Sequence, residues 1–270
     1  MSTIARALDD LRTLDALASR ETALARVDPR AKLVATLAFI VCVLSFDRYS
    51  VAALMPLALY PTVLAAQGEV PLPLLRRALV LASPFALMVG IFNPLFDRAT
   101  MLDVAGMPIS GGWVSFTAIV LRFGLTVSAA LVLVAGTGMP ALCSALARLG
   151  VARVFTVQLM FLYRYTFVLA GEAERMTTAR SLRAAEHSRM SLAVYASLLG
   201  QLLLRAFERA QRIHQAMLAR GFDGALRLAD RRQCKRADTL FVAGWCAFFV
   251  SARAIDLPRA LGALIGAIAQ

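Results

Sequence analysis

The sequence predicts an all-α fold: a polytopic membrane helical protein with two long cytoplasmic helices. Of its 270 residues, 59% are hydrophobic and 17% are charged, and the mean hydropathy is +0.68. Soluble domains usually carry about half apolar and about a quarter charged residues. The apolar residues also form long blocks, which favour a lipid environment over a water-facing core.

Positive charge is concentrated in one interval between the apolar blocks. Residues 137–237 hold 16 Lys and Arg against 6 Asp and Glu, whereas the rest of the chain holds 13 against 11. The positive-inside rule predicts a long cytoplasmic segment for such an interval. We therefore expect three parts. An amphipathic helix and about four transmembrane helices occupy 1–136, the cytoplasmic segment occupies 137–237, and a C-terminal transmembrane part occupies 238–270.

Transmembrane helices are expected where the apolar blocks fall. Asp28 suits the N-cap of the first such helix, and Pro29 suits its first turn. Flanking residues with long side chains extend blocks that are shorter than the ~20 residues of a full span. The blocks cover residues 33–46, 51–66, 79–92, 113–135 and 240–250.

The orientation follows from Lys and Arg near the ends of these blocks. Lys32 precedes the first block, and Arg76 and Arg77 lie between the second and the third, so we expect a multi-pass protein of the cell (inner) membrane with a cytoplasmic N-terminus. Residues 1–26 predict an amphipathic helix, either on the membrane interface or packed on its own protein. Residues 259–270 are apolar enough for a last half or whole span, which leaves the side of the C-terminus open.

Arg122 is the single charged residue within the block 113–135. An arginine inside the membrane faces the protein interior or reaches an interface. It is therefore either a contact for a substrate or ion, or an anchor to a carbonyl or carboxylate on a neighbouring helix. The anchor is favoured because no acidic partners line a pore in this sequence.

Two amphipathic helices are expected in the cytoplasmic segment, over 170–186 and 192–221, and they end in similar triplets: Ala179-Arg180-Ser181 and Ala219-Arg220-Gly221. A small alanine allows close approach, and arginine offers a planar fork of donors for carboxylates or carbonyls. Gly221 suits the left-handed position that ends a helix. Composition alone fits a solvated or lipid-surface pair as well as a docking pair, and the doubled ending favours docking.

Catalytic and metal-binding signatures are absent from this sequence. It contains no GxxxxGK[ST], HExxH or GxSxG, and His187 and His214 are lone residues among charges. No recognisable motif for nucleic-acid binding appears. We therefore expect no enzyme activity, bound cofactor, metal or nucleic acid. We also expect neither a disulfide nor a metal site from the four scattered cysteines, Cys42, Cys143, Cys234 and Cys246.

Several stretches resemble a known family. They are 28–33 (DPRAKL), 93–97 (NPLFD), 161–165 (FLYRY), 179–181 (ARS), 205–210 (RAFERA) and 216–224 (AMLARGFDG). With these residues the chain resembles the T component of energy-coupling factor (ECF) transporters, in the CbiQ branch of cobalt transporters. The first Ala-Arg triplet ends in Ser, where many members have Gly.

The resemblance implies a coupling subunit for import of cobalt, with nickel the nearest alternative, in a family linked to cobalamin biosynthesis. Its partners would be two CbiO-like ATPase subunits that bind the ATP, and a CbiM-like membrane substrate-binding subunit with or without a small CbiN-like subunit. The coupling helices would dock on the ATPases through the two triplets. Supporting roles would fall to Arg164, Glu208, Arg209 and Asp223.

Two other classes of function were weighed. A self-sufficient secondary transporter of a small solute would need inverted repeats and polar groups at mid-membrane. A membrane-bound enzyme would need a cluster of histidines or carboxylates at the membrane edge. The sequence shows neither pattern, so the coupling subunit is the favoured function.

Overall fold

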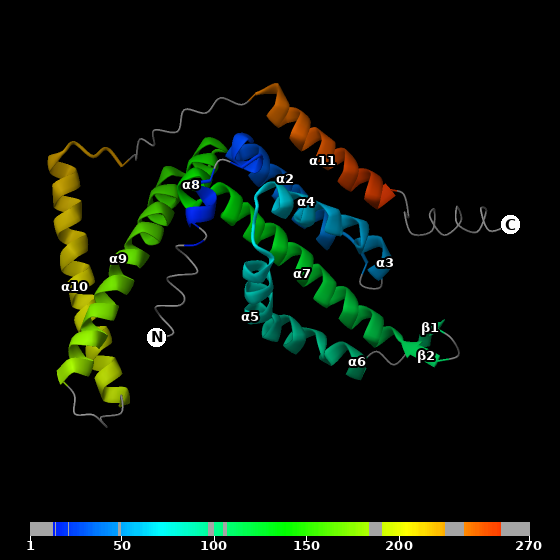
Figure 1. The fold of residues 1–270 in the computed structure, drawn as a ribbon, viewed down its shortest axis with the longest axis horizontal. Coiled ribbons are helices and arrows are strands. Elements are labelled where there is room, and N and C mark those ends of the chain that lie inside the picture. The colour runs from blue at the N-terminus through cyan, green and yellow to red at the C-terminus, as the bar shows by residue number, and fades with distance from the viewer. Residues whose placement is uncertain are drawn as a thin grey trace. The chain divides into compact units, whose positions relative to one another are not determined.

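The computed structural model describes residues 13, 15–20, 22–47, 50–96, 100–104, 107–183, 191–224 and 235–254. The chain forms two compact units, Leu14–Gly138 with Arg231–Gln270, here called the bundle, and Met1–Thr13 with Met139–Asp230. The bundle contains η1 (Leu24–Arg26), α2 (Pro29–Leu44), α3 (Val51–Leu54), η2 (Pro56–Ala58), α4 (Leu59–Gln67), α5 (Leu72–Gly90), α6 (Phe92–Phe96), β1 (Thr100–Val104), β2 (Met107–Ser110), α7 (Gly111–Thr137) and α11 (Arg236–Ala254). The other unit contains α8 (Met139–Arg148), α9 (Arg153–Arg183) and α10 (Leu192–Ala219) (Figure 1).

Helices α2 and α11 begin side by side. Asp28 is the N-cap of α2, as predicted, and its Oδ1 accepts from the backbone N–H of Arg30 at 2.8 Å. Asp238 Oδ1 accepts from the backbone N–H of Asp28 at 2.9 Å, and its Oδ2 accepts from Lys235 N at 2.8 Å. Both aspartates are buried. One carboxylate thus caps α11 and ties it to the start of α2.

The same end of the bundle receives the ends of α4 and α7. Lys32, 1% exposed, donates from Nζ to the carbonyl of Gly136 near the end of α7, at 3.0 Å. A Cβ built on Gly68, the residue after α4, would lie 3.1 Å from Leu24 Cδ2. Helices α4 and α7 therefore run in the same direction, opposite to that of α2. Lys32 was expected as a flank of the first span, and it is a buried tie between two helices.

At the opposite end of the bundle, two arginines bind the turn that follows α2. Arg122 on α7 donates from Nη2 to the carbonyls of Phe46, at 2.8 Å, and Asp47. This is the anchor that the sequence favoured. Arg253 on α11 lies over the Phe46 ring, 5.1 Å from its centroid, and donates to Ser45. Arginines from α7 and α11 thereby hold the turn that follows α2.

Aromatic rings fill the middle of the bundle between α2, α4 and α11. Phe39 stacks on Tyr60 with centroids 4.6 Å apart, and Trp245 and Phe249 meet Tyr60 edge-on. The Tyr60 hydroxyl and Thr36 Oγ1 form a buried hydrogen bond of 2.8 Å. The hydroxyl of this ring cluster is thus paired, so the cluster packs without an unsatisfied hydroxyl.

The loop between α6 and α7 contains a short β-ribbon. Strands β1 and β2 pair antiparallel, with Val104 opposite Met107 and Leu102 opposite Ile109. These strands were not predicted from the sequence, and the fold is all-α in its main architecture. Other predictions fall outside the described residues: most of the helix over 1–26, the segment 259–270, His187 and Cys234.

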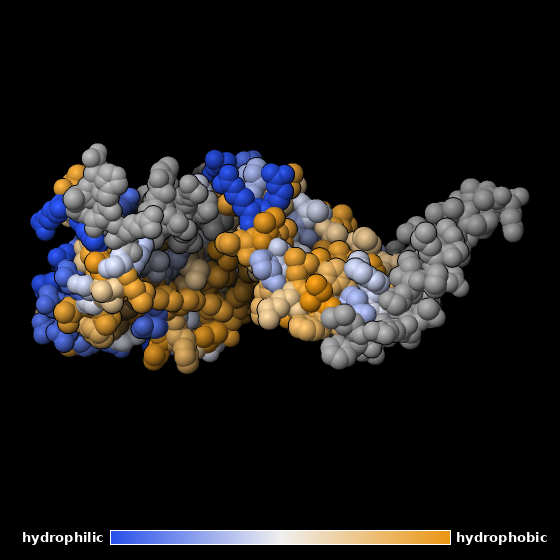
Figure 2. Space-filling view, turned by 90° about the horizontal axis from the view of Figure 1, so that it is seen from below, coloured by the Kyte–Doolittle hydropathy of each residue, from blue (hydrophilic) through white to orange (hydrophobic). Residues whose placement is uncertain are grey.

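Three helices of the described residues are long and apolar enough to cross a membrane: Leu72–Pro94, Gly111–Thr137 and Arg153–Arg183. The first two contain the predicted blocks 79–92 and 113–135, and the third was expected on the cytoplasmic side. Figure 2 shows apolar side chains over much of the surface of the bundle, at the right of the view. A surface of this kind is stable in lipid, and the protein is a membrane protein.

Candidate docking site at the ends of α9 and α10

The first predicted triplet lies in the last turn of α9. Ala179 and Ser181 are exposed, and Ser181 Oγ donates to the carbonyl of Thr178 at 2.8 Å. Arg180 is half-buried, and its Nη1 is shielded from solvent without a hydrogen-bond partner among the described residues. A shielded guanidinium nitrogen favours any acceptor that can reach it. The triplet therefore presents small exposed residues around an arginine with donor capacity to spare.

The second triplet is the C-terminal cap of α10. Ala219 is the last helical residue, Arg220 is the C-cap, and Gly221 has φ +77°. The N–H of Gly221 donates to Leu218 O at 2.9 Å, and that of Phe222 donates to Met217 O at 3.0 Å. These two bonds make a Schellman motif, which confirms the left-handed position predicted for glycine. The exposed Arg220 side chain thus starts from a backbone fixed by two hydrogen bonds.

An ion-pair bridge joins α9 to α10. Glu172 on α9 accepts from Arg175 one turn away at 2.7 Å, and from Arg205 on α10. Glu172 was not among the predicted site residues. Its negative charge was the one clue in the sequence, since residues 137–237 hold only 6 acidic residues against 16 basic ones. The bridge fixes the level at which the two antiparallel helices meet.

The two arginines lie at opposite ends of this α9–α10 hairpin (Figure 1). Arg180 follows Glu172 by eight residues, about 12 Å along α9. Arg220 follows Arg205 by fifteen residues, about 22 Å along α10 in the opposite direction. The structure therefore does not gather the triplets into one site. It separates them by about 35 Å, which is enough for two separate partners.

A groove of about 490 Å³ runs between α9 and α10. Met217 and Phe222 line it and are half-buried, which is the apolar contact that accompanies a Schellman motif. Arg209 also lines the groove. The other residues expected in supporting roles are exposed on the hairpin or just after it: Arg164, Glu208 and Asp223.

Part of the exposed surface of α10 is apolar, and Leu203 and Phe207 in it also line the groove. Leu199, Leu203 and Phe207 are each about 60% exposed. They lie at four-residue spacing on one face, whereas Glu208 and Arg212 lie on another. Monomeric soluble proteins rarely leave such a stripe open, so it indicates a contact with a protein or a membrane. No three His, Cys, Asp or Glu side chains of the described residues lie close enough together to hold a metal ion.

Comparison with known proteins identifies the family. The model of the CbiQ family, described as cobalt transport protein, matches residues 20–230. The chain belongs to this family. The matched part of this CbiQ member includes the bundle from η1 to α7, the α9–α10 hairpin and both Ala-Arg triplets. The predicted resemblance to the CbiQ branch is therefore confirmed.

A curated relative supports the same family assignment. The cobalt transport protein CbiQ of Rhodobacter capsulatus is 38% identical to this chain over 71 residues. The aligned part is 26% of this chain and 29% of the relative, so the match covers less than a third of the relative's length. The family description is one of transport rather than catalysis, consistent with the non-catalytic component predicted from the sequence.

Proposed function

We propose that the chain is the coupling (T) subunit of an ECF-type ABC importer for cobalt or nickel ions. In this proposal it binds two CbiO-like ATPase subunits and passes their movement to a CbiM-like membrane subunit that binds the ion. The observation that supports it best is the pair of arginine-bearing helix ends, about 35 Å apart on one braced hairpin.

Each helix end has the chemistry of a docking tip. Arg180 has donor capacity to spare on Nη1, and Arg220 is exposed beside a rigid cap. Both arginines lie where the carbonyl end of a helix dipole favours a positive charge. An acceptor-lined groove on an ATPase subunit would satisfy the planar guanidinium. Small residues on either side of each arginine allow the close approach that such a groove needs.

The bracing of the hairpin suits transmission of force. The bridge between Glu172 and Arg205 ties the two helices side by side. The Schellman cap prevents the second tip from fraying. A displacement at either tip then moves the hairpin as a unit. The exposed stripe of Leu199, Leu203 and Phe207 offers the apolar surface on which a membrane subunit would be moved.

Charge reversal at the tips tests the proposal. Arg180→Glu, Arg220→Glu and the double variant would be expressed with the ATPase and membrane subunits, with Arg212→Glu as a control on the polar face of α10. Each single change should weaken binding of the ATPase subunit at the changed helix end by at least tenfold, measured as the amount of ATPase recovered with the chain. Breaking one desolvated charge pair costs ~2 kcal/mol or more. The double variant should lose both ATPase copies and radiocobalt uptake.

The control variant should assemble and transport as the unmodified protein does. Melting temperatures and membrane levels of all four variants should match, since the changed side chains lie on the surface of the hairpin or at its ends. Full ATPase recovery and uptake in the double variant would refute docking through these arginines. Uptake by the purified chain alone would instead favour a self-sufficient transporter.

A further inference from the structure

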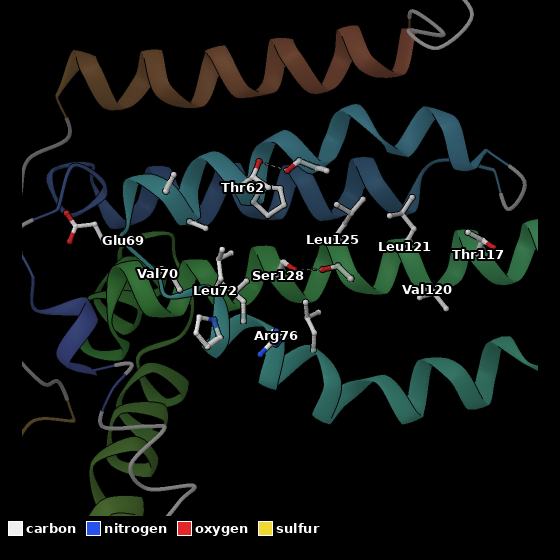
Figure 3. A pocket seen from close by; sticks show the side chains of 18 residues that line it. Thr62, Glu69, Val70, Leu72, Arg76, Thr117, Val120, Leu121, Leu125 and Ser128 are labelled. Atoms are coloured by element: carbon white, nitrogen blue, oxygen red, sulfur yellow. Dashed lines mark hydrogen bonds between the residues drawn. The ribbon is translucent and has the colours of Figure 1, made fainter.

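The bundle contains a second, larger hollow that the docking proposal does not use. A groove of about 1030 Å³ lies between α4, α5 and α7. Its walls are apolar along most of their length, and Leu121, Leu125 and Leu79 belong to them. Figure 3 shows Thr117 toward one end of the groove and Glu69 at the other, with Arg76 on the side of α5.

Helices α5 and α7 close one end of the groove. At the closed end α5 and α7 touch: a Cβ on Gly90 would lie 2.9 Å from the Phe116 ring, and Asn93 Nδ2 donates to Ser115 Oγ at 3.2 Å. Pro84 interrupts α5 between the two ends, and a proline in a helix interior produces a kink. Before Pro84 in the chain, α5 and α7 leave the groove between them, and α5 lines it from Leu72 to Leu79. The groove is therefore wedge-shaped.

The depth of the wedge matches half a bilayer. Its lining follows α7 from Thr117 to Ser128, which is about 16 Å at 1.5 Å per residue. The hydrocarbon core of a bilayer is ~30 Å thick, so one leaflet contributes about half of that. A transmembrane helix of a partner would run the full thickness, and the contact between Gly90 and Phe116 blocks its path. An acyl chain of one leaflet fits the closed wedge.

The opposite end of the wedge carries positive charge. Arg76 lines the groove, and the exposed Arg77 follows it, against the single carboxylate of Glu69. This is the end of the bundle where α2 and α11 begin, and the positive-inside rule assigns it to the cytoplasm. The cytoplasmic leaflet is rich in anionic lipid, and each nearby Arg attracts its headgroups.

We propose that this wedge is a binding site for an anionic phospholipid of the cytoplasmic leaflet. One acyl chain lies between α5 and α7, and the guanidinium of Arg76 binds the phosphate. The proposal does not depend on ATPase docking, because every residue that carries it belongs to the bundle.

Lipid titration of the complete purified chain, followed by native mass spectrometry, tests the headgroup contact. Arg76→Gln should weaken binding of phosphatidylglycerol about fivefold and leave binding of phosphatidylcholine unchanged. Arg77→Gln is the matched control, since it removes the same charge from the next residue, which does not line the groove. Equal losses in the two variants would overturn the site, because they would show only a general attraction between the surface and anionic lipid.

A second pair of variants tests the acyl chain. A Cβ on Gly124, which lines the wedge, or on Gly244, on α11, would meet nothing within 4 Å. Gly124→Leu should fill the wedge and weaken binding of both lipids at least fivefold, whereas Gly244→Leu should leave both unchanged. Unchanged lipid binding in a folded Gly124→Leu variant would overturn the proposal. If that variant fails to fold, the comparison of Arg76 with Arg77 decides alone.

Discussion

Replacing Gly136 by alanine should destabilise the bundle, although alanine is the better helix former. A Cβ at this position would lie 2.5 Å from Leu24 Cδ2, more than 1 Å inside the ~3.5–4.0 Å of a normal carbon–carbon contact. Leu24 cannot retreat easily, because it is 0% exposed and also packs against Gly68. Overpacking of this kind costs ~1–3 kcal/mol. The helix propensity gained is at most ~1 kcal/mol and is smaller near a helix end.

The same change at Gly124 is the matched control, since this glycine lies on the same helix in open space. Gly124→Ala should stabilise the protein by up to ~1 kcal/mol through helix propensity. At ~2–4 °C per kcal/mol, overpacking in Gly136→Ala should lower the melting temperature by about 2–12 °C, of which helix propensity restores at most about 2–4 °C. Gly124→Ala should raise it by at most about 2–4 °C. Trp245 fluorescence in detergent reports on the bundle core. A Gly136→Ala variant that melts at or above the unmodified protein would refute the packing argument.

Two further substitutions test the helix ends. Gly221→Ala forces a side chain into φ +77°, at a cost of ~1–2 kcal/mol. Amide exchange at the end of α10 should therefore rise, and ATPase recovery should fall. The control Gly200→Ala, in the middle of α10, should change neither. Asp238→Ala removes the acceptor for the N–H groups of Asp28 and Lys235 and should lower the melting temperature by about 2–12 °C, from ~1–3 kcal/mol. Asp238→Asn keeps an acceptor oxygen and should lower the melting temperature less than Asp238→Ala does. An equal decrease in the two variants would contradict the hydrogen-bond explanation.

Features that depend on neighbours in the sequence could be predicted well. Asp28 before Pro29 specifies a helix start, and Gly221 specifies a helix end, because capping involves only residues within one turn. The role of Arg122 as an anchor could also be predicted from its charge. A charge inside an apolar helix must find an acceptor, and the structure provides the carbonyls of Phe46 and Asp47.

Features that depend on distant pairing could not be predicted from one sequence. Lys32 precedes an apolar block and looks like an interface residue, yet it reaches a carbonyl 104 positions away. Glu172 and Arg205 are 33 positions apart, and either could have been a solvated surface charge. The wedge between α5 and α7 depends on where two helices touch and where they diverge. None of these is encoded in the periodicity of a single helix.

The side of the membrane on which α9 lies is a further case, since its length and hydropathy alone would make it a span. Contacts within the bundle limit how many times the chain can cross the membrane around α9. Near the end of α7 the carbonyl of Gly136 binds Lys32 at the start of α2, and α11 begins beside the same point, where Asp238 binds Asp28. The chain thus leaves and re-enters the bundle at one end. The number of membrane crossings between α7 and α11 must therefore be even.

An even number excludes α9 as a lone span. Helix α8 has 10 residues, about 15 Å, and is too short to cross. The stretches 184–190 and 225–234 contain at most ten residues each. Helix α10 is the one remaining candidate for a return crossing, and Arg205, Arg209 and Arg212 in its second half would lie in hydrocarbon at a cost of ~2.5–3.5 kcal/mol each. We therefore expect that neither helix crosses and that both Ala-Arg triplets lie on the side of the membrane where α7 ends. Arg76 and Arg77 lie at the same end of the bundle, so the positive-inside rule predicts that this side is cytoplasmic, as the proposed docking of ATP-hydrolysing partners requires.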